Sequence, residues 1–502
     1  MTFLILVFVC APFRFAQGAC PGDCDGSGEV TFNDLIEILT QFGSEGPVEC
    51  DADGSQSVEF NDLVTALSLF GPCPASSGIT MDGSFDDWSG IAPSATDALG
   101  DASGGFDITE VRVASRGTTV FVRFDISNVL NLQAGGFLDG TLLISVTGPS
   151  GDVFEVDTRG REYTLTGEGS VGHAAAGYFA LPTYASEQYE ARIDASIVGA
   201  STGDEVTIRF GGSDELDAPI THTLEPADGE AFVQSIDRAD GTDLRVANLN
   251  VLSRGLTDPD RSDEIHSLIR GVDADVYCFQ EQWNGSASTV RNAMAQAFAG
   301  FTDGREDPSN WNVSIENGAA IATTMPFEAM SVPGSREGGG IVTLDDGTRV
   351  FVLSIHLKCC GSIGSGEDVQ RINATTAYES FFQSLCEDEP GLGIIVTGDW
   401  NLVGSRTPLD ILTDSSDLGL TDLPLLRATQ RLGATWRNPG SSFTPGRLDL
   451  MVYSPAVFDN ARGFILDTTE LGASTLDENG LDADDSEASD HLMLVTDFGV
   501  GG

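Results

Sequence analysis

The sequence predicts a multidomain protein that consists of a small helical module with acidic loops, a β-sandwich and an α/β domain. The chain has 502 residues, which is long enough for about three domains of roughly 150 residues each. Near the N-terminus, an acidic loop followed by an amphipathic helix occurs twice. Farther along, short alternating strands precede a region in which strands alternate with helices. These two patterns are typical of a β-sandwich and of an α/β domain, respectively.

The charge of the chain is strongly negative. It contains 77 Asp and Glu against 25 Lys and Arg, which gives a net charge of −52, and Lys358 is the only lysine. A protein that wraps nucleic acid needs a stripe rich in Lys and Arg, so the composition excludes that class. It also argues against docking on anionic membranes. The composition suits a chain that stays soluble in salt or that binds divalent cations.

Residues 1–18 are predicted to be a signal peptide. The apolar run Phe3 to Phe13 is too short to span a bilayer, and small residues follow it, so cleavage is expected before Ala19. The run lacks a basic segment in front of it. Cys20 leaves a lipoprotein as an alternative, although Gln17 stands where a lipid-attachment signal has an aliphatic residue. The mature protein is therefore expected to be secreted or extracytoplasmic, either periplasmic or at the cell surface, with no membrane span.

Residues 20–73 contain two copies of one motif. The first, DCDGSGEVTFNDLIEILTQFG, begins at Asp23, and the second, DADGSQSVEFNDLVTALSLFG, begins at Asp51. Oxygen ligands at alternating positions of such a loop converge on one hard cation, so both loops are predicted to bind Ca²⁺. The predicted ligands are Asp23, Asp25, Ser27, Glu29 (through its carbonyl) and Asp34 in the first loop, and Asp51, Asp53, Ser55, Ser57 (through its carbonyl) and Asp62 in the second.

This repeat resembles a type I dockerin, because each loop ends in Asp instead of the Glu of ordinary EF-hands and because a helix follows each loop. The resemblance implies two calcium ions and a cohesin partner. A calcium-stabilised appendage without a cohesin partner is the alternative. The second site is expected to be the weaker one, because Gln56 stands where the first loop has Gly28.

The cysteines form two groups. In the C-terminal half, Cys278 lies in an apolar strand and is expected to be buried. Cys359 and Cys360 are adjacent, and a bridge from this pair to Cys386 is one option. The N-terminal module holds four cysteines: Cys20, Cys24, Cys50 and Cys73. Four cysteines can form disulfides in three pairings, and the sequence does not choose among them.

Residues 79–224 are predicted to form a β-sandwich. Short strand patterns, such as Val111 to Ala114 and Thr119 to Asp125, alternate with turns rich in Gly, Asp and Ser. The stretches ITMDGSFDDWSG, TVFVRFDIS and YEARIDASIV resemble family 9 carbohydrate-binding modules and related sandwiches. This resemblance implies a polysaccharide partner, for which Trp88 and four tyrosines are candidate stacking residues, although Trp88 fits a core position better. The four tyrosines are Tyr163, Tyr178, Tyr184 and Tyr189. The sequence does not assign a binding site.

Residues 243–498 are predicted to form the α/β domain, with helices near 262–270, 287–299 and 368–385. Polar residues follow or interrupt several of its apolar strands, and such strand ends gather at one edge of the sheets. The set contains carboxylates, amides and two of the five histidines, and no motif for a nucleophilic Ser or Cys. It suits metal-assisted attack of water on a phosphoester. The residues are Asn248, Asn250, Glu281, His356, Asp399, Asn401, Asp449, Asp490 and His491.

In order along the chain, the motifs LRVANLNVL, CFQEQW, IATTMPF, LSIHLK, VTGDWNLV, GRLDLMVY and SDHLM resemble the endonuclease/exonuclease/phosphatase superfamily. The resemblance implies a four-layer α/β sandwich of two mixed sheets flanked by helices. It also implies a catalytic Mg²⁺ or Mn²⁺, with Glu281 as the main ligand and Asn248 and Asn250 nearby. Asn250 stands where many members have Asp, which puts a second metal in doubt.

The same resemblance implies the other roles. Asp399 orients or deprotonates the attacking water, and Asn401 positions the phosphate. His491 contacts the phosphoryl oxygens, and Asp449 fixes its tautomer. The resemblance places the last two residues as follows: His356 lies on the other side of the phosphate, and Asp490 lies near the metal or pairs with a histidine.

The substrate is left open between three hypotheses. Residues 241–502 contain 16 basic and 39 acidic residues, which gives a net charge of −23. A nuclease gains most of its nonspecific affinity from Lys and Arg, so this charge favours a secreted phosphodiesterase or phosphatase with a compact substrate. An extracellular nuclease of the same fold is the second hypothesis. The third is a carbohydrate- or cohesin-binding scaffold protein whose enzyme domain is inactive.

Overall fold

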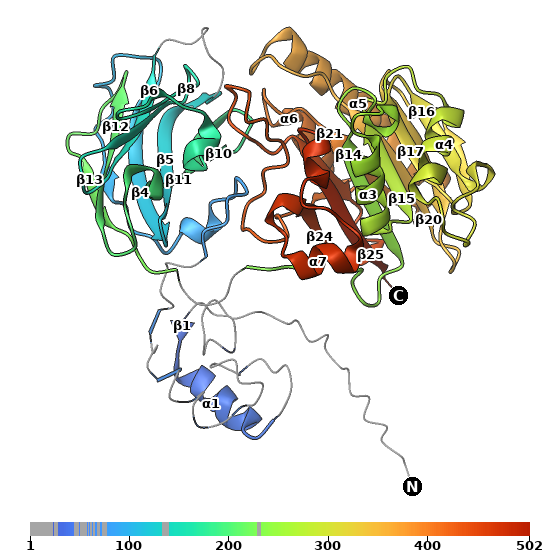
Figure 1. Ribbon diagram of the computed structural model, residues 1–502, viewed down its shortest axis with the longest axis horizontal. Helices are drawn as coiled ribbons and strands as arrows, with labels where there is room; N and C mark the ends of the chain where they lie inside the picture. The colour runs from blue at the N-terminus through green and yellow to red at the C-terminus, as the bar shows by residue number, and fades with distance from the viewer. Residues whose placement is uncertain are drawn as a thin grey trace. The chain divides into compact units, whose positions relative to one another are not determined.

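The computed structural model describes Cys24, residues 29–44, Cys50, Val58, Phe60, Leu63, residues 66–67, 71–72, 78–132, 140–227 and 232–501. Two compact units divide the chain, Met1–Gly78 and Ile79–Gly502, and both are drawn in Figure 1. The predicted signal peptide lies outside the described residues. None of the described helices is long and apolar enough to cross a membrane.

In the first unit, one helix is held at its start by a capping box. β1 (Glu29–Val30) pairs antiparallel with β2 (Gly71–Pro72), and α1 (Phe32–Gln41) follows. The Thr31 hydroxyl accepts a hydrogen bond from the Asn33 amide, and the Asp34 carboxylate accepts one from the Thr31 amide. Two otherwise unpaired amides at the helix start are thereby satisfied.

Of the predicted calcium ligands, the structure describes only Glu29 and Asp34. The Asp34 side chain is fully buried. Its Oδ1 accepts a hydrogen bond from the Cys24 amide at 2.9 Å, and its Oδ2 accepts one from the Thr31 amide at 2.7 Å. The calcium loops therefore remain a prediction. The other eight ligands lie outside the described residues: Asp23, Asp25, Ser27, Asp51, Asp53, Ser55, Ser57 and Asp62.

Residues 95–223 of the second unit contain two antiparallel sheets around one shared hydrophobic core (Figure 1). The first has the order β10-β11-β5-β4-β3, and the second has the order β13-β12-β6-β7-β8-β9. The first sheet consists of β3 (Ala95–Thr96), β4 (Ile108–Arg116), β5 (Thr119–Leu130), β10 (Phe179–Leu181) and β11 (Ser186–Asp194). The second consists of β6 (Leu142–Thr147), β7 (Val153–Asp157), β8 (Glu162–Leu165), β9 (Gly169–Ser170), β12 (Glu205–Gly212) and β13 (Ile220–Thr223).

The aromatic residues considered for sugar stacking are mostly part of the core. Trp88 is fully buried, and its indole donates a hydrogen bond to the buried Glu190 carboxylate at 3.1 Å. Tyr163, Tyr178 and Tyr189 are also buried. A side chain buried in the core cannot offer a face to a sugar ring, so the interpretation of these three tyrosines as stacking residues is wrong.

The rest of the second unit contains two six-stranded mixed sheets, with the orders β16-β17-β15-β14-β25-β24 and β18-β19-β20-β21-β23-β22. In each sheet one central pair is parallel, β14 with β15 and β20 with β21. The first sheet contains β14 (Leu244–Asn250), β15 (Val276–Gln280), β16 (Asn312–Glu316), β17 (Ala319–Thr323), β24 (Phe458–Leu466) and β25 (Met493–Val500). The second contains β18 (Phe327–Met330), β19 (Glu337–Thr343), β20 (Arg349–His356), β21 (Gly393–Asp399), β22 (Thr421–Asp422) and β23 (Asp449–Tyr453).

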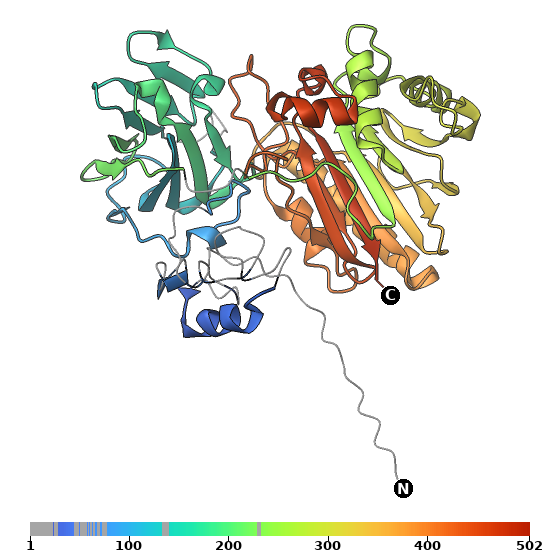
Figure 2. The same cartoon turned by 60° about the horizontal axis from the view of Figure 1, so that its bottom comes forward.

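This part of the chain has four layers in the order helices, sheet, sheet and helices (Figures 1 and 2). A hydrophobic core lies between each pair of neighbouring layers. The helices α3 (Ser262–Val272) and α4 (Ala287–Ala297) pack on the first sheet. On the second sheet lie α5 (Gly366–Asp388) and α6 (Thr407–Thr413). Apolar residues of both sheets, such as Val276 and Ile395, share the middle core. A short helix, α7 (Ala473–Asn479), precedes β25. The three helices predicted from the sequence correspond to α3, α4 and α5.

The cysteines take three kinds of position. Cys24 forms a disulfide with Cys50, and the other two cysteines of that module, Cys20 and Cys73, lie outside the described residues. Cys278 is buried and free, as its apolar strand predicts. Cys359, Cys360 and Cys386 are also free, so the suggested bridge to Cys386 is wrong in this structure.

Candidate active site

Strand register brings three of the predicted site residues side by side. His356 ends β20 and Asp399 ends β21, and because these strands are parallel the two residues pair directly. β23 runs antiparallel to β21, and its first residue, Asp449, pairs with Asp399. In the facing sheet, β14 ends at Asn250 beside the end of β15, and Glu281 follows β15 directly. The strand ends of both sheets therefore meet at one edge.

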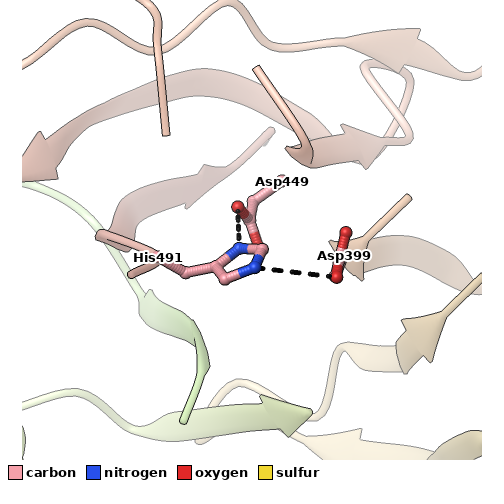
Figure 3. Close-up of side chains that lie close together, drawn as sticks. All are labelled: Asp399, Asp449 and His491. Carbon is pink, nitrogen blue, oxygen red and sulfur yellow. Dashed lines mark hydrogen bonds and ion pairs between the residues drawn. The ribbon is translucent and has the colours of Figure 1, made fainter. Parts of the chain in front are cut away.

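A line of three buried side chains forms the centre of this edge (Figure 3). His491 Nδ1 donates a hydrogen bond to Asp449 Oδ2 at 2.8 Å, and its Nε2 lies 3.8 Å from Asp399 Oδ2. Burial alone would lower the pKa of His491, but the carboxylates of Asp449 and Asp399 outweigh this effect and raise the pKa to about 10. The imidazole is therefore positively charged at neutral pH.

The Asp399 carboxylate lies between the two histidines. Its Oδ2 accepts a hydrogen bond from Asn250 Nδ2 at 3.1 Å and is 3.5 Å from His356 Nε2. Its Oδ1 accepts one from the Asn401 amide at 3.1 Å. Burial raises the pKa of Asp399 to about 7, against the opposing effect of His491. This carboxyl group is thus poised to gain or lose a proton near neutral pH.

His356 has the opposite electrostatic character to His491. Burial lowers its pKa to about 4, so the ring is neutral at pH 7. Its Nδ1 is buried and has no hydrogen-bond partner among the residues that the structure describes. The Trp283 ring lies 5.4 Å from the imidazole, and the Arg336 guanidinium lies 5.2 Å from the Trp283 ring. One neutral and one charged imidazole therefore flank Asp399.

Glu281 is more open than Asp399 and Asp449, with 21% of its side chain exposed. Its backbone has a φ of 61°, a conformation that non-glycine residues seldom adopt and that often marks functional sites. Its Oε2 accepts a hydrogen bond from the Ser253 amide at 3.0 Å, and its Oε1 is 3.4 Å from Asn250 Nδ2. Asn248 is fully buried, and its Oδ1 accepts a hydrogen bond from Gln280 at 2.8 Å.

Three other polar residues have different surroundings. Asp490 Oδ2 accepts a hydrogen bond from the Trp436 indole at 3.0 Å, and no histidine bonds to Asp490 among the described residues. Asn401 has a φ of 48°, and its amide side chain donates to the Leu357 carbonyl at 3.3 Å. Arg447 forms an ion pair with Asp422. Of the two alternatives for Asp490, the pairing with a histidine is absent.

Sequence reasoning missed the segment that supplies Thr435 and Trp436. The Thr435 hydroxyl donates to Asp449 Oδ2 at 2.8 Å, next to the hydrogen bond from His491. This segment contains no regular strand or helix that a periodic pattern could indicate. Trp283 was in principle detectable, because it stands two residues after Glu281 within the motif CFQEQW.

The β-sandwich contacts the same segment. The Tyr163 hydroxyl is 2.9 Å from Thr444 Oγ1, and His173 Nε2 is 3.1 Å from the Asn438 carbonyl. Arg447 donates its backbone amide to Thr183 Oγ1 at 2.8 Å. The sandwich therefore supports the outer side of a segment whose inner side touches Asp449 and Asp490.

The donor set fits a hard divalent cation. Asp399, Asp449 and His491 offer ligand atoms within 4.8 Å of one another. However, Asp449 and His491 already bond to each other, so a cation there would break that pair. The more exposed Glu281 carboxylate keeps acceptor capacity, and oxygen is the donor that Mg²⁺ prefers. Among these groups Glu281 is the best anchor for a metal.

Comparison with known proteins identifies the family of this domain. The model of the Endonuclease/Exonuclease/phosphatase family matches residues 247–491. This segment therefore belongs to the endonuclease/exonuclease/phosphatase family. No curated protein matches the chain in sequence.

Several solved structures are similar to this part of the chain. The human Nocturnin catalytic domain with bound sulfate anion is 17% identical, with 52% of this chain and 95% of that chain covered and a TM-score of 0.35. Truncated Caenorhabditis elegans TDP2 is 17% identical, with 53% and 99% covered and a TM-score of 0.35. The 3′-5′ exonuclease NExo from Neisseria meningitidis is 16% identical, with 51% and 99% covered and a TM-score of 0.37.

Proposed function

We propose that residues 243–498 form a divalent-metal-dependent phosphoester hydrolase, a phosphodiesterase or phosphatase, that attacks phosphorus with water. One observation carries this proposal: a buried carboxylate, Asp399, lies between a neutral imidazole, His356, and a charged one, His491. Such a set can take a proton from water on one side and stabilise negative charge on the other. The family to which residues 247–491 belong supports phosphoester chemistry.

Each side chain has a distinct task in the proposed reaction. Asp399, once ionised, orients the attacking water and accepts its proton. The charged His491 donates a hydrogen bond to a phosphoryl oxygen as negative charge develops there, and Asp449 holds its ring in the correct tautomer. His356 Nε2 lies 3.5 Å from the same Asp399 oxygen, and this imidazole also contacts the phosphate. Asn401 helps to position the phosphate.

Glu281 would hold the metal, and Asn250 lies next to it. Bound Mg²⁺ or Mn²⁺ would neutralise phosphate charge and act as a Lewis acid. Asn248 is less suited to bind the metal, because its side-chain carbonyl oxygen already accepts a hydrogen bond from Gln280. We therefore assign Asn248 a supporting role and Glu281 the principal one.

The proposal extends to the remainder of the chain. We propose that the enzyme is exported by residues 1–18 and that the module at 20–73 binds Ca²⁺. The support is the apolar run and the duplicated acidic motif in the sequence. A scaffold protein with an inactive enzyme domain is disfavoured, because such a protein would have no need to keep two histidines with opposite pKa shifts beside Asp399.

The test compares two substrates as the salt concentration changes. With a net charge of −23 on residues 241–502, the domain should repel a polyanion more than a compact diester. Repulsion between exposed charges is screened over about 10 Å at 0.1 M salt. Hydrolysis of duplex DNA, where present, should therefore hold or rise as NaCl increases, and hydrolysis of bis-p-nitrophenyl phosphate should change little. Initial rates at fixed Mg²⁺ measure both effects.

The Asp399→Ala variant serves as the control for contaminating enzymes and should be inactive on both substrates. A steep fall of DNA cleavage with salt would favour the nuclease, because phosphate contacts by Lys and Arg produce that slope. Equal rates for Asp399→Ala and the unmodified protein would contradict the proposed function altogether.

The pH dependence should follow Asp399. Burial raises its pKa to about 7, so the carboxyl group is neutral below that pH and cannot accept a proton from water. We expect kcat/KM to fall as the pH decreases through about 7, with a midpoint that moves lower as Mg²⁺ is raised, because a nearby cation favours the carboxylate. The measurement is kcat/KM against pH at two Mg²⁺ concentrations. A profile that is flat through neutral pH would exclude Asp399 as the proton acceptor.

A further inference from the structure

The segment after β20 carries two adjacent cysteines that the proposed chemistry does not use. The Sγ atoms of Cys359 and Cys360 are 2.9 Å apart, and neither residue forms a disulfide. Cys360 is exposed, and Cys359 is half-buried. A disulfide bond is about 2.0 Å long, so the two sulfur atoms need to approach by only about 1 Å to form one.

Hydrogen bonds from helix α5 hold the backbone around the two cysteines. The buried guanidinium of Arg371, on α5, donates to the Lys358 carbonyl at 2.7 Å and to the Cys360 carbonyl at 2.9 Å. The same guanidinium forms an ion pair with the buried Asp368. Two carbonyls that flank Cys359 are thus tied to one rigid group, which limits how far the sulfur atoms can separate.

Two further features fit a strained, reactive turn. Cys360 has a φ of 70°, a left-handed conformation that is unfavourable for a non-glycine residue and that persists only where surrounding contacts maintain it. The next residue, Gly361, has a φ of 78°, and a Cβ there would collide with the Ser365 side chain. The Lys358 ammonium lies 3.8 Å from Cys359 Sγ, so a positive charge stands beside that sulfur.

We propose that Cys359 and Cys360 form a dithiol site that small-molecule disulfides oxidise reversibly to a disulfide between the two adjacent residues. Cys359, as its thiolate, attacks the external disulfide, forms a mixed disulfide and releases one thiolate. The Cys360 thiol then loses its proton and attacks Cys359 Sγ, which closes the ring and releases a second thiolate. Two electrons pass from the protein to the external disulfide, which becomes two thiols.

The ring formed by adjacent residues is small and strained. Strained or exposed disulfides have higher reduction potentials and are readily reduced again. The dithiol site is therefore expected to cycle between its two states. Exposure of Cys360 gives the external disulfide access to the site.

Peptide mapping tests this proposal. The reduced full-length protein is incubated with oxidised glutathione, alkylated without reductant and cleaved with trypsin, which cuts after Lys358 and Arg371. We expect the peptide 359–371 to be unalkylated and lighter by two hydrogen atoms than its dithiol form. Mild reduction should restore two alkylated cysteines. The buried Cys278 should remain a thiol throughout and serves as an internal control.

Two variants assign the steps. Cys360→Ser removes the second thiol, so a glutathione adduct should accumulate on Cys359. Cys386→Ser is the matched control and should form the ring as the unmodified protein does. The proposal is overturned if peptide 359–371 of the unmodified protein stays doubly alkylated in excess oxidised glutathione, or if it becomes linked to the peptide that contains Cys386.

Discussion

Replacing His491 with alanine should lower kcat by a factor on the order of 10² or more. Its imidazole carries a positive charge, because Asp449 and Asp399 raise its pKa to about 10. It is also held rigidly, since Nδ1 donates to Asp449 at 2.8 Å. A preorganised charge in a buried site costs no reorganisation when negative charge develops on the phosphate. The measurement is kcat on bis-p-nitrophenyl phosphate at saturating Mg²⁺.

A second substitution separates the charge of His491 from its bulk. Asp449→Asn keeps the size of the side chain but removes the negative charge that raises the pKa of His491, so it should also lower kcat, by a smaller factor. His222→Ala is the matched control, because this histidine lies in the β-sandwich and bonds to Ser115. His222→Ala should keep the kcat of the unmodified protein, and a normal kcat in His491→Ala would remove His491 from the mechanism.

The sequence could predict most of the site because strand ends leave a recognisable pattern. His356 and Asp399 each close a run of apolar residues, and parallel strands bring such ends to one edge. The sequence pattern does not show which residues of neighbouring strands pair, however. Only the structure shows that Asp449 pairs with Asp399 across β21 and β23 and that Asp399 therefore lies between two histidines.

Other parts of the site and fold lacked a local signal. Thr435 and Trp436 lie in an irregular segment whose position depends on contacts with distant residues, such as Asp449 and Asp490. β19 has the sequence EGGGIVT, whose glycines weaken any strand prediction. In the structure these glycines permit close packing, because a Cβ at Gly338 would lie 3.0 Å from the backbone of Ala320.

The burial of the tyrosines in the β-sandwich could not be predicted from the sequence either. A strand pattern indicates that one face is buried, but it does not say which tyrosine points to that face. Tyr163 satisfies both conditions of a core position: its ring is buried, and its hydroxyl lies 2.9 Å from the hydroxyl of the buried Thr444. An aromatic residue with its polar end satisfied in this way is a packing residue, and resemblance to sugar-binding modules could not reveal that contact.

Removal of divalent metal should abolish phosphoester hydrolysis, and added Mg²⁺ should restore it. Glu281 is more exposed than Asp399 and Asp449, and its two oxygens keep acceptor capacity beyond the hydrogen bonds from the Ser253 amide at 3.0 Å and from Asn250 Nδ2 at 3.4 Å. Glu281→Gln removes the negative charge that attracts the cation. We expect the Mg²⁺ concentration needed for half-maximal activity to rise by about 10-fold or more, in line with the loss of a group that supports a metal site.

Calorimetric titration with Mg²⁺ provides a readout that does not depend on turnover, and Glu281→Gln should weaken the binding measured there by the same factor. Glu328→Gln is the matched control, since Glu328 is exposed on β18 and pairs only with Arg349 among the described residues. The distinction between kcat and Mg²⁺ affinity is informative, because Glu281→Gln should recover much of its rate at high Mg²⁺, whereas His491→Ala should not. Full activity in excess chelator would show that the charged groups around Asp399 act without a metal.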